Sequence, residues 1–212
     1  KGVEDLGAND NPAWAFSPLN NFYYIHEAFA PQFDAKGYSE NPTRATGNDC
    51  FTARPAKDDW YETIKLNYGV FYQNGGEQQF DPIPNTWYKM RDILLFWASK
   101  GIDGFRCDMA EMVPQAFWAW AIAQVKEQYP TILFIAEVYN PDLYRSYIAA
   151  GFDYLYDKVG MYDYLRGVTS KNWAVEGITQ QWQAVDDIRN HMLYFLENHD
   201  EQRIASGFFC GR

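Results

Sequence analysis

The sequence of 212 residues contains few cysteines, no basic run and no long apolar stretch. Cys50, Cys107 and Cys210 are far apart and form no CxxC pair, which indicates neither a disulfide framework nor a zinc site. No apolar run approaches the roughly 18–20 residues of a membrane span. The net charge of -10, without a basic segment, argues against nucleic acid as a partner. These absences favour a globular protein with a neutral or cationic ligand.

Aromatic residues, by contrast, are abundant, and 18% of the chain is Phe, Tyr or Trp. With 47% hydrophobic and 22% charged residues, the composition is that of a globular chain rather than a disordered one. Flat amphipathic rings pack in cores and also stack on sugars and bases. The chain begins at Lys1 without methionine and ends abruptly after Gly-Arg, so we expect a piece of a longer protein, and the lack of a signal peptide carries no information.

The composition and periodicity of the sequence change near residue 80. Residues 1–80 are rich in Asn, Asp, Gly and Pro, which predicts an irregular, loop-rich small domain. Across 81–212, helical and strand patterns alternate, which predicts parallel strands joined by crossover helices. The expected elements are helices at 85–101, 114–130 and 141–151, a helical region at 159–190, and strands at 102–108, 131–138, 152–158 and 191–200.

Two α/β architectures fit this alternation, a doubly wound open sheet and a (β/α)8 barrel. No GxGxxG or GxxxxGK[ST] motif follows an expected strand, which disfavours a nucleotide-binding sheet. Polar residues instead end the strands, namely Arg106, Asp108, Glu137, Asn198, His199 and Asp200. Because reactive groups at the carboxyl ends of strands are typical of barrel enzymes, we favour an α/β fold that forms part of a (β/α)8 TIM barrel.

Arg106 and Asp108 should share one face of their strand, because side chains alternate along a strand. If Phe105 and Cys107 face the helices, the two charges face the barrel axis. A lone buried ion costs several kcal/mol, so they should pair. The pair could simply join strands, or the arginine could hold a carboxylate ionised and oriented as a nucleophile.

Glu137 ends an apolar strand, on the face that also carries Leu133 and Ile135. A carboxyl group among apolar side chains has a raised pKa, and this suits a general acid. The alternative is a glutamate at a strand end that faces solvent.

Asp200, next to His199, supplies a third carboxylate. A polar loop or a pair of metal ligands would be the alternative, but His26 and His191 give no sign of a shared metal site. Three carboxylates at the ends of three parallel strands, with an arginine and a histidine, match glycoside hydrolysis with retention. In that reaction one carboxylate is the nucleophile and another group donates a proton.

Three segments in this order resemble signature regions of the alpha-amylase family of retaining glycoside hydrolases: GIDGFRCDMAEMV (101–113), FIAEV (134–138) and FLENHD (195–200). In that family they end the fourth, fifth and seventh barrel strands. The resemblance is clearest over 64–203 and implies a central fragment of the catalytic barrel, from about the third helix to the seventh strand. Residues 1–80 would then be the small domain between the third strand and third helix, and KLNYG (65–69) resembles the motif before that helix.

The resemblance also implies roles for individual residues. Asp108 would be the nucleophile, and Arg106 would hold it ionised. Glu137 would protonate the leaving oxygen and then deprotonate the attacking water. His199 and Asp200 would bind sugar hydroxyls.

Two departures from the family pattern matter. The third-strand motif DxxxNH is absent and should lie upstream, so we expect the rest of the parent barrel to be needed and the fragment alone to be inactive. Glu111 and Met112 stand where many relatives carry Lys-His, so Glu111 is expected beside the leaving-group subsites. Aromatic candidates for stacking on glucose rings are Tyr139, Trp173, Trp182 and Tyr72, with core burial as the alternative.

The sequence identifies no cofactor, but the resemblance implies that calcium could bind through Asn and Asp oxygens of the small domain at Asn9, Asp10, Asn48 and Asp49. Ordinary turn residues are the alternative reading of that set.

The leading functional prediction is an endo-acting hydrolase of starch-like α-1,4-glucans that forms a covalent glucosyl-aspartate. The alternatives are a transglycosidase or isomerase that acts on sucrose, maltose or trehalose, and a non-catalytic barrel relative. Polymeric glucans do not cross membranes, so a secreted, cell-surface or periplasmic location is expected.

Overall fold

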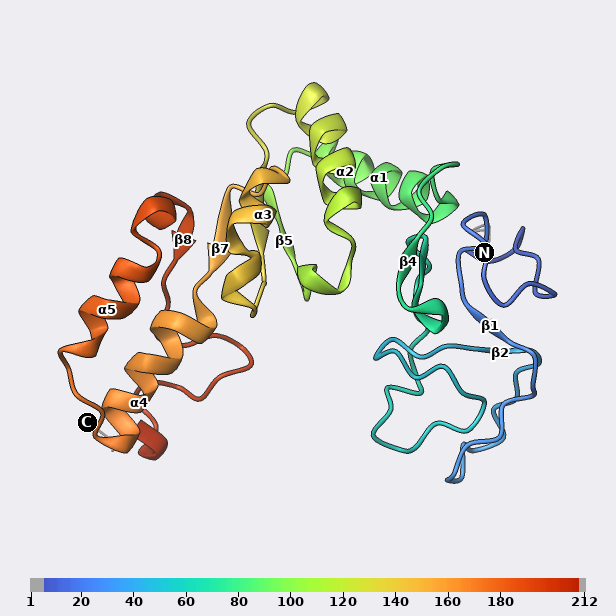
Figure 1. Ribbon diagram of the computed structural model, residues 1–212, viewed down its shortest axis with the longest axis horizontal. Coiled ribbons are helices and arrows are strands. Elements are labelled where there is room, and N and C mark those ends of the chain that lie inside the picture. Colours follow the sequence, from blue (N-terminus) through green and yellow to red (C-terminus); the bar gives the residue numbers. More distant parts are fainter. Residues whose placement is uncertain (1–5, 210–212) are drawn as a thin grey trace. The chain divides into compact units, whose positions relative to one another are not determined.

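The computed structural model describes residues 6–209, and the chain forms two compact units that meet in sequence between Ile93 and Leu94 (Figure 1). The boundary falls inside helix α1 (Asn85–Ala98). The predicted boundary at residue 80, and the insertion of residues 1–80 between a third strand and a third helix, stay predictions. Cys210 lies outside the described residues.

The first unit consists mainly of loops held by buried side-chain amides. Its strands are two antiparallel pairs, β1 (Tyr24–Ile25) with β2 (Thr43–Arg44), and β3 (Val70–Phe71) with β4 (Glu77–Gln78). Asn67 of the KLNYG segment is fully buried, and its Nδ2 donates to the carbonyls of Ser17 and Asn20 at 2.8 and 2.9 Å. These bonds satisfy loop carbonyls that no strand ladder reaches.

The second unit alternates strands and helices around one parallel sheet. After α1, the elements are β5 (Gly104–Cys107), α2 (Gln115–Gln128), β6 (Leu133–Ala136), α3 (Tyr144–Ala149), β7 (Tyr154–Tyr156), α4 (Asp163–Lys171), α5 (Gly177–Ala184) and β8 (Met192–Leu193). The strands pair in the order β5-β6-β7-β8, all parallel. The predicted α/β class with parallel strands is confirmed, but among residues 6–209 the sheet does not close into a barrel.

The two faces of this sheet differ in burial. One face is packed and carries Cys107, Phe134, Ala136, Leu155 and Met192. The Phe152 ring contacts both Phe134 and Trp118 of α2, with centroids 6.3 and 5.1 Å apart, so α2 covers this face. The other face carries Arg106, Leu133, Glu137, Tyr154, Tyr156 and Leu193, and several of its apolar side chains are exposed.

Two predicted elements were too long. The strand expected at 191–200 is limited to Met192–Leu193, because the Asn198 side chain accepts the N–H groups of Asp200 and Glu201 and forms a turn. The helical region expected at 159–190 is broken into separate helices, and α4 ends at Asn172, whose φ of 55° is left-handed.

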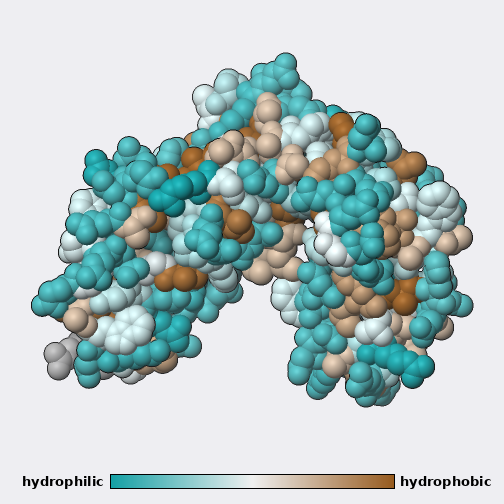
Figure 2. All heavy atoms as spheres, in the orientation of Figure 1, coloured by the Kyte–Doolittle hydropathy of each residue, from teal (hydrophilic) through white to brown (hydrophobic). Residues whose placement is uncertain are grey.

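The described residues contain no helix with the length and hydropathy needed to cross a membrane. Figure 2 shows hydrophobic residues in small groups among hydrophilic ones on the face in view.

The buried thiol of Cys107 can be used to test which face of β5 packs against the helices. Burial raises its pKa to about 12, and its side chain is 7% exposed. In a variant with Cys50→Ser and Cys210→Ser, we therefore expect DTNB at pH 8 to label native Cys107 at least about 100-fold more slowly than the denatured chain. Equal rates would contradict the placement of Cys107 against the helices. A variant that keeps only Cys50, which is partly exposed, is the control.

Candidate active site

Arg106 lies between two carboxylates at the carboxyl ends of β5 and β6. Its Nη1 forms an ion pair with Asp108, and its Nη2 lies 2.9 Å from Oε1 of Glu137. Its guanidinium also lies 5.6 Å from the centroid of the Tyr156 ring on β7. Burial alone would lower the pKa of Arg106, but the contacts with Asp108 and Tyr156 and the charge of Glu137 raise it above its usual value. Arg106 is therefore a permanent cation between two acids.

The side chain of Glu137 is only 3% exposed, yet its surroundings are polar. Oε1 accepts a hydrogen bond from the Tyr139 hydroxyl at 3.0 Å in addition to the ion pair with Arg106, and Oε2 accepts the N–H of Met109 at 2.9 Å. The prediction of an apolar pocket around Glu137 was therefore wrong. The pattern of β6 showed its apolar neighbours in sequence but not the donors that β5 and the following turn contribute.

Backbone bonds hold the two acidic segments in register beyond the strands. The N–H of Glu137 donates to the Cys107 carbonyl at 3.0 Å, and the N–H of Ala110 donates to the Glu137 carbonyl at 3.0 Å. Met109, directly after Asp108, adopts a left-handed conformation with φ 43°. This conformation is unfavourable for a residue other than glycine, and here it accompanies the bond from the Met109 N–H to Glu137.

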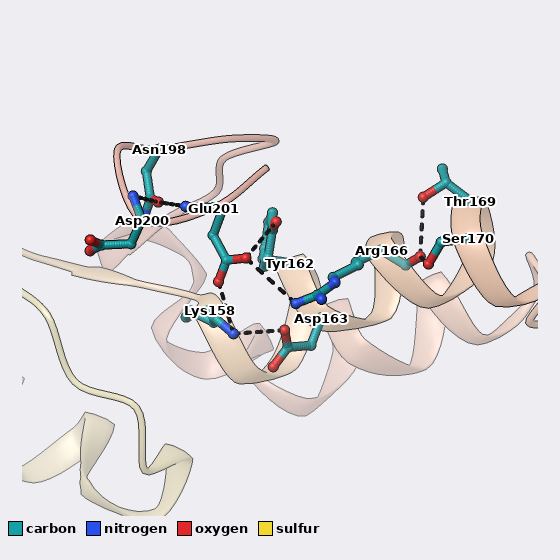
Figure 3. Close-up of polar contacts among 9 residues, drawn as sticks. All are labelled: Lys158, Tyr162, Asp163, Arg166, Thr169, Ser170, Asn198, Asp200 and Glu201. Atoms are coloured by element: carbon teal, nitrogen blue, oxygen red, sulfur yellow. Dashed lines mark hydrogen bonds and ion pairs between the residues drawn. The ribbon is translucent and has the colours of Figure 1, made fainter. Parts of the chain in front are cut away.

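A separate network fixes the loop that carries Asp200 (Figure 3). Glu201, next to Asp200, lies 3.1 Å from Nζ of Lys158 and accepts a hydrogen bond from the Tyr162 hydroxyl at 3.0 Å. Arg166 approaches the same carboxylate at 3.5 Å, and Lys158 also binds Asp163 at 2.9 Å. The Glu201 side chain therefore ties this loop to the helical segment after β7.

Lys158 connects this network to the acid on β6. Its Nζ lies 5.8 Å from the centroid of the Tyr139 ring, and the Tyr139 hydroxyl donates to Glu137. Burial, the hydrogen bond to Glu137 and the charges of Glu137, Asp200 and Glu201 raise the pKa of Tyr139 to about 12. Tyr139 therefore remains a hydrogen-bond donor at any physiological pH. The charge of Asp200 contributes to the raised pKa of Tyr139.

The structure thus brings Asp108, Arg106, Glu137 and Tyr139 into direct contact. Asp200 and His199 pair with each other at 3.3 Å on an exposed loop rather than at the end of a strand. Their predicted contacts with sugar hydroxyls stay predictions, as do the catalytic roles of Asp108 and Glu137.

Glu111 has a contact that the sequence did not suggest. Its Oε2 accepts the N–H groups of Tyr139 at 3.3 Å and Asn140 at 3.1 Å. Glu111 therefore positions the loop after β6, and its expected place beside the leaving group stays a prediction.

The other aromatic candidates lie in different settings. Trp173 packs on Tyr164 with ring centroids 5.4 Å apart, and Trp182 of α5 is 44% exposed. Tyr72 belongs to the first unit, where Lys65 lies 4.6 Å from its ring centroid. None of these contacts tests a role in sugar binding.

The residues considered for calcium are engaged with protein groups. The carboxylate of Asp10 accepts hydrogen bonds from Asn21, Phe22 and Tyr24. Asp49 forms an ion pair with Lys65. Within residues 6–209 no group of three or more His, Cys, Asp and Glu side chains is arranged to hold a metal ion.

Sequence reasoning missed Tyr156, Lys158 and Glu201. Alternation in FDYLYDK does place Tyr156 on the open face of the sheet, so Tyr156 could have been found. No local pattern links Lys158 to Glu201, because the two are joined only by the tertiary fold.

Replacing Lys158 by Met tests whether this network supports activity. In the intact protein, loss of the bond to Glu201 should loosen the Asp200 loop. We expect kcat/KM for the glycosyl donor to fall about tenfold, since a hydrogen bond to a charged group contributes about 1.5–3 kcal/mol. Lys171→Met is the matched control, because Lys171 faces Trp173 instead. A drop in thermal stability with unchanged kcat/KM would mean that Lys158 has a structural role only.

A parallel sheet that carries an arginine between two carboxylates at its carboxyl edge defines the class as an α/β protein with a cluster of charged side chains at the ends of its strands. The sequence matches no family model. It is 36% identical over 164 residues to the alpha-1,4-glucan:maltose-1-phosphate maltosyltransferase of Chlorobaculum tepidum, covering 71% of this chain and 24% of the relative. It is 33% identical over 136 residues to the enzyme of that name from Cereibacter sphaeroides, covering 60% of this chain and 21% of the relative.

Two solved enzyme structures are also similar to this chain. An alpha-amylase from Lactobacillus plantarum matches 70% of this chain and 35% of its own, with a TM-score of 0.52 and 28% identity. The cyclic alpha-maltosyl-(1→6)-maltose hydrolase of Arthrobacter globiformis, at 18% identity, matches 90% of this chain and 38% of its own with a TM-score of 0.60, and so supports the fold alone.

The chain belongs to the alpha-amylase family. It spans about a quarter or less of the length of these two curated relatives.

Proposed function

We propose that the protein transfers glycosyl groups from α-1,4-glucosidic donors by double displacement, with Asp108 as nucleophile and Glu137 as acid and base. The observation that carries this proposal is Arg106, whose two Nη atoms contact both carboxylates. One guanidinium thus holds both acids at the same edge of the sheet. Retaining enzymes use a pair of carboxyl groups about 5–5.5 Å apart, one as nucleophile and one as acid and base, and the proposal assigns these roles to Asp108 and Glu137.

In the first step, a carboxylate oxygen of Asp108 attacks the anomeric carbon, and the bond from that carbon to the leaving oxygen breaks. Protonated Glu137 gives its proton to the leaving oxygen. In the second step, Glu137 as carboxylate takes a proton from the acceptor hydroxyl, whose oxygen displaces Asp108 from the anomeric carbon. The anomeric configuration is inverted twice and so retained.

Arg106 serves this sequence by electrostatics. A cation that contacts Asp108 favours its ionised form, which is the nucleophile, and orients the attacking oxygen. The same cation would stabilise the Glu137 carboxylate that forms after proton transfer. Tyr139 and the Met109 N–H support that carboxylate from the other side.

The group that displaces Asp108 in the second step determines the reaction: water gives hydrolysis, and a sugar hydroxyl gives glycosyl transfer. We propose that the acceptor is a sugar hydroxyl. The curated relatives, at 33–36% identity, are named as maltosyltransferases that use maltose-1-phosphate, whereas the alpha-amylase of L. plantarum is less similar at 28%. Hydrolysis of α-1,4-glucans, the leading prediction from sequence, remains the second candidate on the strength of that alpha-amylase.

An assay with two donors separates the candidates. The intact protein should release inorganic phosphate from maltose-1-phosphate and lengthen an α-1,4-glucan acceptor. Release of reducing ends from starch, without phosphate release from maltose-1-phosphate, would establish the hydrolase instead. No turnover of either donor would contradict the proposal.

We also propose that further strands of the intact protein complete a barrel around this sheet. Within the described residues β5 and β8 each have one unpaired edge. The open face exposes Leu133, Tyr154 and Leu193 to about 40%. Exposed strand edges and apolar sheet faces are liabilities unless they are covered.

A further inference from the structure

The first unit contains a cavity, and its lining residues include none of those that carry the proposed chemistry. This cavity has a volume of about 340 Å³, is open on one side and is lined by residues between Phe29 and Ile64. Its volume falls within the range of about 300–1,000 Å³ that small-molecule sites occupy. We propose that this cavity binds a short neutral saccharide.

Aromatic rings form part of the cavity wall. Phe29 and Tyr38 pack edge to face with centroids 5.3 Å apart and an interplanar angle of 83°. Tyr38 is 52% exposed, and Tyr61 lines the cavity with its ring tilted against Phe33. Exposed tyrosine rings combine a flat apolar face with a polar hydroxyl, and this suits the C–H faces and hydroxyls of a pyranose.

The charged side chains around the cavity are of both signs with one acid in excess, which favours a neutral ligand over an anionic one. Lys36 and Arg44 are opposed by Asp34, Glu40 and Glu62. Arg44 is paired with Glu40, so donors and acceptors stand side by side at the wall, as neighbouring sugar hydroxyls require. A phosphate or carboxylate ligand would instead need an excess of cations.

Thr43 supplies an unused polar group. It is 1% exposed and lines the cavity, and its Oγ1 is buried without a hydrogen-bond partner among the described residues. A buried hydroxyl without a partner is costly, so a small movement of this wall that brought the hydroxyl into contact with a ligand hydroxyl would be favoured. Thr43 and Arg44 form β2, whose pairing with β1 fixes both at the wall.

The test is hydrogen–deuterium exchange of the intact protein with maltotriose as the probe. Asp108→Asn is used as background so that the probe is not consumed. The choice of maltotriose rests on the proposed function, while the presence of a polyol site rests on the cavity. We expect maltotriose to slow exchange in peptides that cover residues 29–64. In Tyr38→Ala, the maltotriose concentration that gives half of the maximal protection should rise about tenfold or more.

The control is Trp60→Ala, since Trp60 is also 52% exposed in the first unit but does not line the cavity. This variant should bind as the parent does. Protection confined to peptides around residues 106–139, equal losses in Tyr38→Ala and Trp60→Ala, or protection of 29–64 by inorganic phosphate but not by maltotriose would each overturn the proposal. Protection of 29–64 in a protein that turns over neither donor would retain the saccharide site and reject the proposed function.

Discussion

Replacing Asp108 by Asn in the intact protein should lower kcat by about 10⁴-fold or more with every glycosyl donor. An amide is a poor nucleophile, so the covalent intermediate cannot form. The substitution would also leave Arg106 with one carboxylate partner instead of two. Binding of the glucan should change far less than kcat, because the substitution is nearly isosteric. Steady-state kinetics on maltose-1-phosphate and on α-1,4-glucan measure this directly.

Asp103→Asn is the matched control for this experiment. Asp103 lies five residues earlier, is exposed and makes no contact with Arg106 that the structure records. Its replacement should leave kcat within about twofold, as expected for surface substitutions. If Asp108→Asn kept a tenth of the parent kcat, Asp108 would not be the nucleophile.

Replacing Glu137 by Gln should slow most the reactions whose leaving group must be protonated as it departs. With an α-1,4-glucan as donor, the alkoxide leaving group is strongly basic, and kcat should fall about 10³-fold. With an α-glycosyl fluoride as donor, the fluoride ion leaves without a proton from an acid. The rate of the first step should therefore fall less than about tenfold. Pre-steady-state measurement of fluoride release separates that step from the second.

Two further substitutions, Glu111→Gln and Tyr139→Phe, show whether the effect is specific to Glu137. Glu111→Gln keeps the acceptor for the N–H groups of Tyr139 and Asn140, and Tyr139→Phe removes one donor to Glu137. Neither should separate the two kinds of donor as Glu137→Gln does. Equal losses on glucan and fluoride in Glu137→Gln would contradict its role as the acid.

The strand that carries Arg106 was well predicted from the sequence because its pattern is local. Alternation placed Phe105 and Cys107 on one face, and Cys107 is indeed buried. Arg106 and Asp108 do form a pair, but Asp108 follows the strand and its side chain is 72% exposed, so the expectation that burial forces the two charges together was wrong. The parallel register that sets Arg106 opposite Ile135 then brings Glu137 within reach, as expected for consecutive strands of one parallel sheet.

The surroundings of Glu137 could not be predicted in the same way. Its partners Arg106 and Met109 come from a segment about 30 residues earlier, and the left-handed backbone at Met109 has no sequence signature. The loop of Asp200 was predicted as strand because HMLYFL is apolar and β-prone. Side-chain bonds of Asn198 and Glu201 outweigh that propensity, and Glu201 depends on Lys158, which only the fold brings near.

The central claim is that Asp108 becomes covalently bound to the sugar, and peptide mass spectrometry tests it most directly. The Glu137→Gln variant is incubated with an α-glycosyl fluoride, quenched in acid and digested, because its second step lacks a base and the intermediate should accumulate. We predict that the peptide containing Asp108 gains the mass of one glycosyl residue, and that Asp108→Asn in the same background abolishes the gain. A glycosyl group found on another residue, or a product with inverted configuration and no labelled peptide, would contradict the account.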